Sequence, residues 1–199
     1  MLESYRNYIK NGEAIIPDGV TFIEEEAFAH CTELKRVVLP ESVTKIGAMA
    51  FLDCPKLKSI VLPDSIMWIG DLSFNGCSSL ESVRIPSSVS YIGAAAFLGC
   101  TSLVNIELSA AISEIRPHTL GQCKSLKEVR IPESVRILQD AAFYECTSLK
   151  KVVLPDSITE IAAAAFYGCS QLSEINIPDS VVEIGDAAFF GCTSLKDLV

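Results

Sequence analysis

Cysteine recurs at one fixed interval along the whole 199-residue chain. The eight cysteines, always 23 residues apart, are Cys31, Cys54, Cys77, Cys100, Cys123, Cys146, Cys169 and Cys192. Other residue types keep the same step, and residues 80–102 fit the full consensus Leu-x-x-Val-x-Ile-Pro-x-Ser-Val-x-x-Ile-Gly-x-x-Ala-Phe-x-Gly-Cys-x-Ser. A fixed period of about 20–50 residues is typical of solenoids and arrays, and 23 residues are too few for a propeller blade, which needs about 40.

Each repeat also predicts its own local structure, as residues 80–102 illustrate. Val83 and Ile85 alternate with polar residues, which indicates a strand with its apolar side facing inward. Pro86 lacks an N–H and therefore ends that strand. Ile92 belongs to a second short extended piece, and the apolar spacing within residues 96–100 predicts one helical turn facing inward. A single repeat buries almost nothing, so the core must come from stacking repeats on one another.

The pattern resembles the BspA-type leucine-rich repeat family. The resemblance covers residues 11–199 and is carried by runs of Pro-x-Ser-Val-x-x-Ile-Gly-x-x-Ala-Phe-x-Gly-Cys-x-Ser-Leu, best at residues 86–103. Members of the family are typically surface or secreted proteins of bacteria and some protists. The resemblance therefore implies a non-enzymatic protein–protein interaction module in cell-surface adhesion or host-protein binding, with a host extracellular-matrix or cell-surface protein as partner. The family motif contains no catalytic residue.

We accordingly expect an α/β solenoid of about eight turns. It would be a right-handed leucine-rich-repeat horseshoe or superhelix, with a parallel β-sheet on the concave face and short strands or helical turns on the other faces. The whole chain, residues 1–199, is expected to be a single domain. Residues 1–10 would form an N-terminal cap, with Leu2, Tyr5, Tyr8 and Ile9 near helical spacing. Residues 11–194 would form eight repeats and residues 195–199 a partial repeat.

Composition narrows the possible functions. The formal net charge of -9 and the lack of a basic block argue against nucleic acid or an anionic membrane as partner. No apolar run approaches about 18 residues, so no membrane insertion is expected. Residues 1–10 lack the basic end and apolar core of a secretory signal, so only the resemblance indicates a cell-surface or secreted location.

Several alternatives to an adhesive module remain open. Two histidines offer little material for acid–base catalysis or zinc, so we expect no enzyme, cofactor or metal. The first alternative is a structural spacer, or an excised or designed repeat fragment with no dedicated site. The second is an enzyme or a carbohydrate-active protein. A carbohydrate site usually needs exposed aromatic side chains, and the single tryptophan, Trp68, lies in the variable part of its repeat.

The cysteines and a row of acidic residues raise the question of covalent or metal sites. One cysteine at a fixed position per repeat predicts a ladder of buried, reduced thiols. Disulfides and metal sites are disfavoured, because disulfide frameworks have irregular spacing and zinc sites need Cys-x-x-Cys pairs. The residues after the repeat prolines could form a calcium site or simply belong to turns stabilised by the serines that follow them. These residues are Asp18, Glu41, Asp64, Glu133, Asp156 and Asp179.

Two surfaces are candidate partner-binding sites. On the concave face, among the outward-pointing residues of the predicted sheet, we single out Val38, Val61, Arg84 and Arg130, the valines forming a small apolar patch with Ile15. A mixture of apolar, polar and charged side chains on a regular repeat backbone is typical both of a recognition surface and of any solvated sheet face. On the turn side, the residue after each core phenylalanine is apolar and aromatic in three successive repeats, at Tyr144, Tyr167 and Phe190. This strip would be a partner site or a ladder that only stabilises the stack.

Two irregularities interrupt the pattern. The fifth repeat has Ser109 for Pro, Ala111 for Ser, Arg116 for Gly and Leu120 for Phe, which indicates tolerated drift or a local ligand site or hinge. At the other irregularity, residues 195–199 stop inside the strand of a further repeat. Because an uncovered apolar end favours association, we expect end-to-end self-association through the C-terminal repeat.

Overall fold

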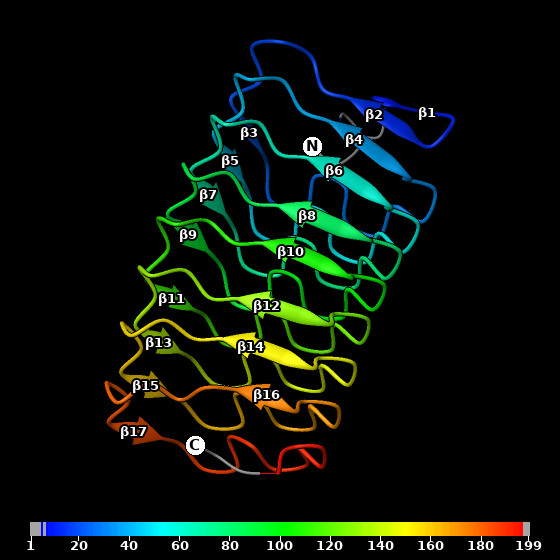
Figure 1. The fold of residues 1–199 in the computed structure, drawn as a ribbon. Coiled ribbons are helices and arrows are strands. Elements are labelled where there is room, and N and C mark those ends of the chain that lie inside the picture. The colour runs from blue at the N-terminus through cyan, green and yellow to red at the C-terminus, as the bar shows by residue number, and fades with distance from the viewer. Residues whose placement is uncertain (1–4, 6, 197–199) are drawn as a thin grey trace.

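The fold is a stack of similar coils (Figure 1), and the computed structural model describes residue 5 and residues 7–196. Strands of two or three residues are its regular elements. They are β1 (Ile9–Lys10), β2 (Glu13–Ile15), β3 (Phe22–Ile23), β4 (Arg36–Val38), β5 (Lys45–Ile46), β6 (Ser59–Val61), β7 (Trp68–Ile69), β8 (Ser82–Arg84), β9 (Tyr91–Ile92), β10 (Asn105–Glu107), β11 (Glu114–Ile115), β12 (Glu128–Arg130), β13 (Ile137–Leu138), β14 (Lys151–Val153), β15 (Glu160–Ile161), β16 (Glu174–Ile175) and β17 (Glu183–Ile184).

Each coil contributes one strand to each of two faces. The even-numbered strands from β2 to β16 form the first face, and the odd-numbered strands from β3 to β17 form the second (Figure 1). Paired strands from successive coils run parallel at an offset of 23 residues, as in the register of Val37 with Ile60 and of Ile46 with Ile69. Seven complete turns separate β2 from β16, so the described residues form a parallel β-solenoid of about seven turns.

The third face is where the structure departs from the expected helical turn. The Cys100 N–H donates to the Phe97 carbonyl (3.2 Å), whereas the Phe97 N–H donates to the Thr119 carbonyl of the next coil (2.9 Å). Positive φ angles of 52° at Ala95 and 74° at Gly99 also interrupt any helix. These two positions are left-handed in every described coil. The segment is therefore a series of short turns bonded to the next coil, and the α part of the expected α/β class is not confirmed.

The core consists of similar layers, one from each coil. The rings of Phe28, Phe51, Phe74 and Phe97 are fully buried and stack at centroid distances of 5.1–5.2 Å. Leu120 interrupts this stack before Phe143 resumes it.

All eight cysteines are buried thiols rather than disulfides, which confirms the predicted thiol ladder. From Cys54 onward each Sγ donates to the carbonyl found 26 residues earlier, as Cys100 does to Phe74 at 3.3 Å. Burial raises the pKa of the Cys100 thiol well above its usual range, so the ladder stays protonated and uncharged.

The N-terminal residues pack against the first coil. Tyr5 is helical, and the chain then forms β1, which pairs antiparallel with β2. The Tyr5 ring contacts the first core ring, Phe28, edge-on at 5.5 Å. Leu2, which belongs to the predicted N-terminal cap, lies outside the described residues, as do residues 197–199 of the predicted partial repeat. No helix in the described part of the chain is long and apolar enough to cross a membrane.

The fifth repeat keeps the stack intact by a compensating substitution. In other coils a serine donates to the carbonyl found 22 residues earlier, as Ser88 does to Ile66 (2.6 Å). Ala111 stands at this serine position, and its acceptor by register is the Val89 carbonyl. Ser109, two residues earlier and buried, donates to that same carbonyl at 2.6 Å. The hydrogen-bonded pairing of strands on the second face is nevertheless interrupted between β9 and β11.

Candidate functional site

Residues at the same position of successive repeats lie above one another and form a row of side chains. The candidate surfaces are therefore such rows. Three of them carry exposed aromatic or apolar groups: the turn-side strip, the first sheet face, and a hollow on the second sheet face. They lie on different sides of each coil, since they come from different positions of the 23-residue repeat.

The turn-side strip consists of Tyr144, Tyr167 and Phe190, and the structure brings the three rings together. The Tyr144 and Tyr167 rings stack at 5.2 Å with 14° between their planes, and the Tyr167 and Phe190 rings stack at 5.1 Å with 21°. His118 lies edge-on to Tyr144 at 6.3 Å. Phe190 is 63% exposed, and the tyrosines are half-buried. The Glu145 carboxylate, through a hydrogen bond and its charge, raises the pKa of Tyr144.

The predicted residues of the first sheet face do not form one cluster. Ile15, Val38 and Val61 are adjacent, because β2, β4 and β6 pair in register through them, and Val61 is 69% exposed. Arg84 lies further along the face on β8, where its guanidinium is 3.7 Å from each of two exposed carboxylates, those of Asp64 and Glu107.

Arg130 lies further still, on β12. It lines a separate shallow hollow of about 380 Å³ with Ile106 and Glu133. The first face therefore carries an apolar patch at one end and dispersed charges beyond it.

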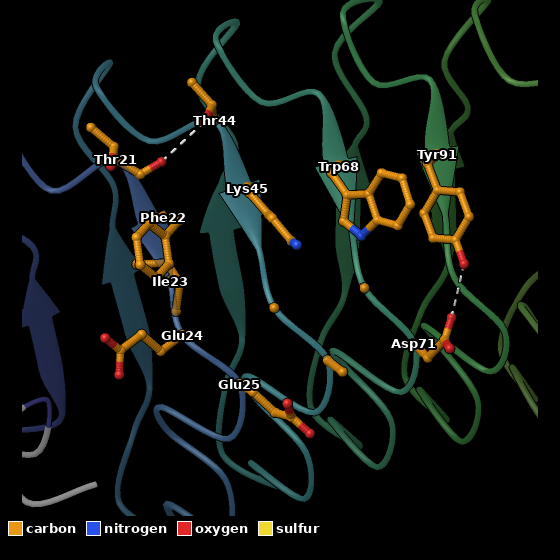
Figure 2. Close-up of a pocket in the computed structure, with 13 residues that line it drawn as sticks. Thr21, Phe22, Ile23, Glu24, Glu25, Thr44, Lys45, Trp68, Asp71 and Tyr91 are labelled. Atoms are coloured by element: carbon orange, nitrogen blue, oxygen red, sulfur yellow. Dashed lines mark hydrogen bonds between the residues drawn. The ribbon is translucent and has the colours of Figure 1, made fainter. Parts of the chain in front are cut away.

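Another hollow, of about 680 Å³, lies on the second face over β3, β5, β7 and β9 (Figure 2). One wall is a row of four side chains, each of which comes just before a buried isoleucine: Phe22, Lys45, Trp68 and Tyr91. Trp68 and Tyr91 stack face to face, with centroids 3.6 Å apart and 9° between their planes. Phe22 is 50% exposed and Trp68 39%. A partly exposed wall of three aromatic rings and one lysine thus runs across four coils.

Cations lie at both ends of the Trp68–Tyr91 pair. The Lys45 Nζ is 5.5 Å from the Trp68 ring centroid, and the Arg116 guanidinium carbon is 4.5 Å from the Tyr91 ring centroid. Arg116 also forms an ion pair with Glu114 at 2.7 Å. These contacts hold the two rings upright on the sheet by cation–π attraction.

Backbone forms the floor of the hollow. Steric crowding explains why glycines occupy it. A Cβ on Gly47 would lie 2.7 Å from the Glu25 nitrogen, and one on Gly70 would lie 2.6 Å from the Ala48 nitrogen. Close packing of successive coils therefore favours glycine here, and these positions add no side chain to the floor. The row continues at Gly93, is interrupted from Arg116 onward and has glycine again at Gly185.

Polar groups face the aromatic wall. Glu24, Glu25 and Asp71 line the opposite side (Figure 2). The Asp71 Oδ1 accepts hydrogen bonds from the Tyr91 hydroxyl (3.3 Å) and the Ala94 N–H (2.9 Å). Partial burial and the charge of Asp71 raise the pKa of Tyr91, so its phenol remains a donor at neutral pH.

The structure places the other candidate groups of the sequence in supporting roles. Serines after the acidic row donate to carbonyls of the preceding coil, for example Ser65 to Val43 (2.6 Å) and Ser157 to Val135 (2.6 Å), as turn residues rather than nucleophiles. Among residues 5 and 7–196, no group of three or more His, Cys, Asp or Glu side chains is arranged to hold a metal ion.

Sequence reasoning missed the aromatic wall because it considered Trp68 alone. The repeat register contained the signal. The first residue of each second-face strand is aromatic in three of the first four repeats. It reads Phe22, Lys45, Trp68, Tyr91, Glu114, Ile137, Glu160 and Glu183. Only the fold shows that the glycine row lies beside it.

Comparison with known proteins identifies the repeat. The family model described as BspA type Leucine rich repeat region matches residues 3–127 and 113–199 in six copies. A leucine rich repeat protein of T. pallidum is 33% identical, with a TM-score of 0.66 over 94% of this chain and 79% of that one. No curated protein sequence matches the chain.

Two further solved structures share the architecture. A leucine-rich repeat protein from Eubacterium ventriosum has a TM-score of 0.80 at 23% identity, over 94% of this chain and 60% of that one, which shows the fold alone. A leucine rich cell surface protein from Faecalibacterium prausnitzii has a TM-score of 0.59 at 27% identity, over 87% of this chain and 61% of that one. The chain thus spans under two thirds of the length of these two proteins.

Proposed function

The chain belongs to the BspA-type leucine-rich repeat family and is a protein-interaction repeat module; we propose that it is non-enzymatic and adheres to a host extracellular-matrix or cell-surface protein. The observation that carries this proposal is the turn-side strip. Tyr144, Tyr167 and Phe190 stack into one continuous aromatic surface on a repetitive frame. Exposed, contiguous aromatic surface is typical of interaction sites, where tyrosine in particular combines apolar area with a hydrogen-bonding hydroxyl.

Relatives support a location where such a partner is accessible. The Faecalibacterium protein is a cell surface protein, and PcpA, which is similar in fold, is a pneumococcal vaccine antigen. By analogy with these proteins we propose a cell-surface or secreted location for this chain. The apolar patch of Ile15, Val38 and Val61 on the first sheet face is the second candidate contact, with Arg84 and Arg130 beyond it.

A binding assay with two matched variants tests the proposal. Plates coated with collagen, laminin or fibronectin are incubated with the chain, with the strip variant Tyr144→Ser/Tyr167→Ser/Phe190→Ser, or with the patch variant Val38→Ser/Val61→Ser. We expect the chain to bind at least one of these proteins and the strip variant to lose at least about tenfold in affinity, as for loss of central aromatic anchors. The patch variant should keep most of the affinity.

The same variants distinguish the alternatives. A spacer without a dedicated site predicts no saturable binding to any coated protein. A strip that only stabilises the stack predicts unchanged binding and a lower melting temperature for the strip variant.

Self-association through the C-terminal repeat is supported by Val182 and Ile184, which are exposed on the last coil. It predicts a rise in mass with concentration in sedimentation, reduced by Val182→Ser.

A further inference from the structure

We propose that the hollow on β3, β5, β7 and β9 binds a neutral oligosaccharide of two or three pyranose rings. The proposal goes beyond the protein-binding function, because it concerns another face of the solenoid and another class of ligand. It rests on the aromatic wall, the glycine floor and the facing hydrogen-bonding groups, all of which lie on the same coils (Figure 2).

The wall matches the apolar side of a sugar. A pyranose ring has faces of C–H groups that pack on aromatic rings and an equator of hydroxyls that needs hydrogen-bond partners. Phe22 and Trp68 stand two strands apart, about 10 Å, and only the flexible Lys45 lies between them. A sugar ring in this gap contacts the Trp68 face opposite Tyr91, and the Lys45 ammonium moves aside to donate to a hydroxyl.

The facing groups match the hydroxyls. Glu25 is exposed, and Asp71 accepts from Tyr91 and Ala94 through its Oδ1, while its Oδ2 is a second acceptor. Carboxylate acceptors and an ammonium donor on opposite sides of the hollow suit a ligand that both donates and accepts.

The charge of the lining excludes anionic saccharides. Three carboxylates, those of Glu24, Glu25 and Asp71, line the hollow against one ammonium, that of Lys45. The whole chain carries a formal net charge of -9. Sialylated, sulfated or phosphorylated saccharides are therefore repelled.

The stacked aromatic pair and the glycine floor lie on the same coils. Aromatic side chains occupy this row at Trp68 and Tyr91, and glycines occupy the floor at Gly47, Gly70 and Gly93. Both rows change at the fifth repeat, where Arg116 replaces the floor glycine and contacts the last ring of the wall. Glycine returns at the floor position only at Gly185, where the wall position is Glu183, so an aromatic wall residue and a floor glycine occur together only in residues 68–70 and 91–93. The volume of about 680 Å³ lies within the range of small-molecule sites.

The test uses the single tryptophan as a local reporter. Trp68 fluorescence is followed while the chain is titrated with cellotriose, chitotriose, maltotriose or mannotriose, and separately with 3′-sialyllactose and with tetralysine. At least one neutral trisaccharide should give a saturable change in the millimolar range or below, whereas 3′-sialyllactose and tetralysine should not.

Variants locate the site. Glu25→Gln, which leaves the reporter in place, should weaken binding severalfold in the same titration. Trp68→Ala, measured by calorimetry, should lower the association constant at least about tenfold, as for a central aromatic anchor. Ile137→Ala is the matched control, since Ile137 holds the same row position in a later coil. It should leave binding unchanged, as should the strip variant.

The outcomes that overturn the proposal are distinct from failure of the adhesive function. Absence of saturable binding by all four neutral trisaccharides overturns it, as does equal binding by 3′-sialyllactose. Binding of tetralysine alone would instead identify an acidic groove for a cationic peptide. Circular dichroism shows whether each variant is folded. If Trp68→Ala does not fold, Glu25→Gln decides between the outcomes, because its side chain is exposed.

Discussion

Ser109 provides the sharpest test of how the irregular fifth repeat stays in the stack. Its hydroxyl, only 1% exposed, donates to the Val89 carbonyl at 2.6 Å and accepts from the Ala111 N–H at 3.1 Å. Ser109→Ala leaves the Val89 carbonyl buried without this donor, which costs about 1–3 kcal/mol of the free energy of unfolding. The exposed Ala111 N–H can bond water instead and adds little.

A second substitution should recover most of this loss. Ala111 stands where other coils have the donating serine, so Ala111→Ser directs a hydroxyl at the same carbonyl. The distance expected from the other coils is close to the 2.6 Å seen at Ser88 and Ser157. We expect Ser109→Ala/Ala111→Ser to regain at least half of the lost free energy, whereas Ala111→Ser alone is near neutral.

Urea and thermal denaturation followed by circular dichroism measure the four proteins of this double-mutant cycle. At about 2–4 °C per kcal/mol for a chain of this size, the single variant should melt roughly 4–8 °C lower for a loss of about 2 kcal/mol. Two results would refute the reasoning: a loss below about 0.5 kcal/mol for Ser109→Ala, or a double variant as unstable as the single one.

Three further predictions concern stability. Ser73 is fully buried, and its hydroxyl has no hydrogen-bond partner, so Ser73→Ala should stabilise the chain by about 1 kcal/mol in urea denaturation; a destabilisation would contradict this. Burial raises the pKa of Cys192 from 9.0 to about 11 and that of deeper thiols further. Stability should therefore hold below pH 9 and fall as pH rises above it, by roughly 1.4 kcal/mol per pH unit for each fully buried thiol. Denaturation at pH 7, 9 and 10.5 tests this, and alkylation should label Cys192 first in the folded chain and all eight thiols after unfolding. Gly99, with φ of 74°, should lose about 1 kcal/mol on Gly99→Ala, and an unchanged midpoint would argue against the left-handed turn.

The repeat sequence predicted the core because burial depends on periodicity. Phe97, Cys100 and Val83 each recur at one position, and each is buried as expected. The helical turn was wrong for a physical reason. The spacing of inward residues is similar in a helical turn and in successive tight turns, and only the hydrogen bonds to the next coil, such as Phe97 to Thr119, distinguish the two.

The candidate sites were less predictable because they depend on neighbouring rows. Tyr144 and Tyr167 could be placed together from register alone, and their rings do stack. The hollow required two rows at once, the wall containing Trp68 and the floor containing Gly70, and their proximity follows from how the chain turns after each short strand. Compensation by Ser109 was missed since it shifts a hydroxyl by two residues out of register.

Hydrogen–deuterium exchange of the chain, bound to whichever coated matrix protein binds it most tightly, tests the proposed adhesive function most directly. An adhesive strip predicts added protection concentrated in residues 141–145, 164–168 and 187–191, the turns that carry the aromatic strip. Protection confined to the first sheet face, or no added protection under saturating conditions, would contradict it.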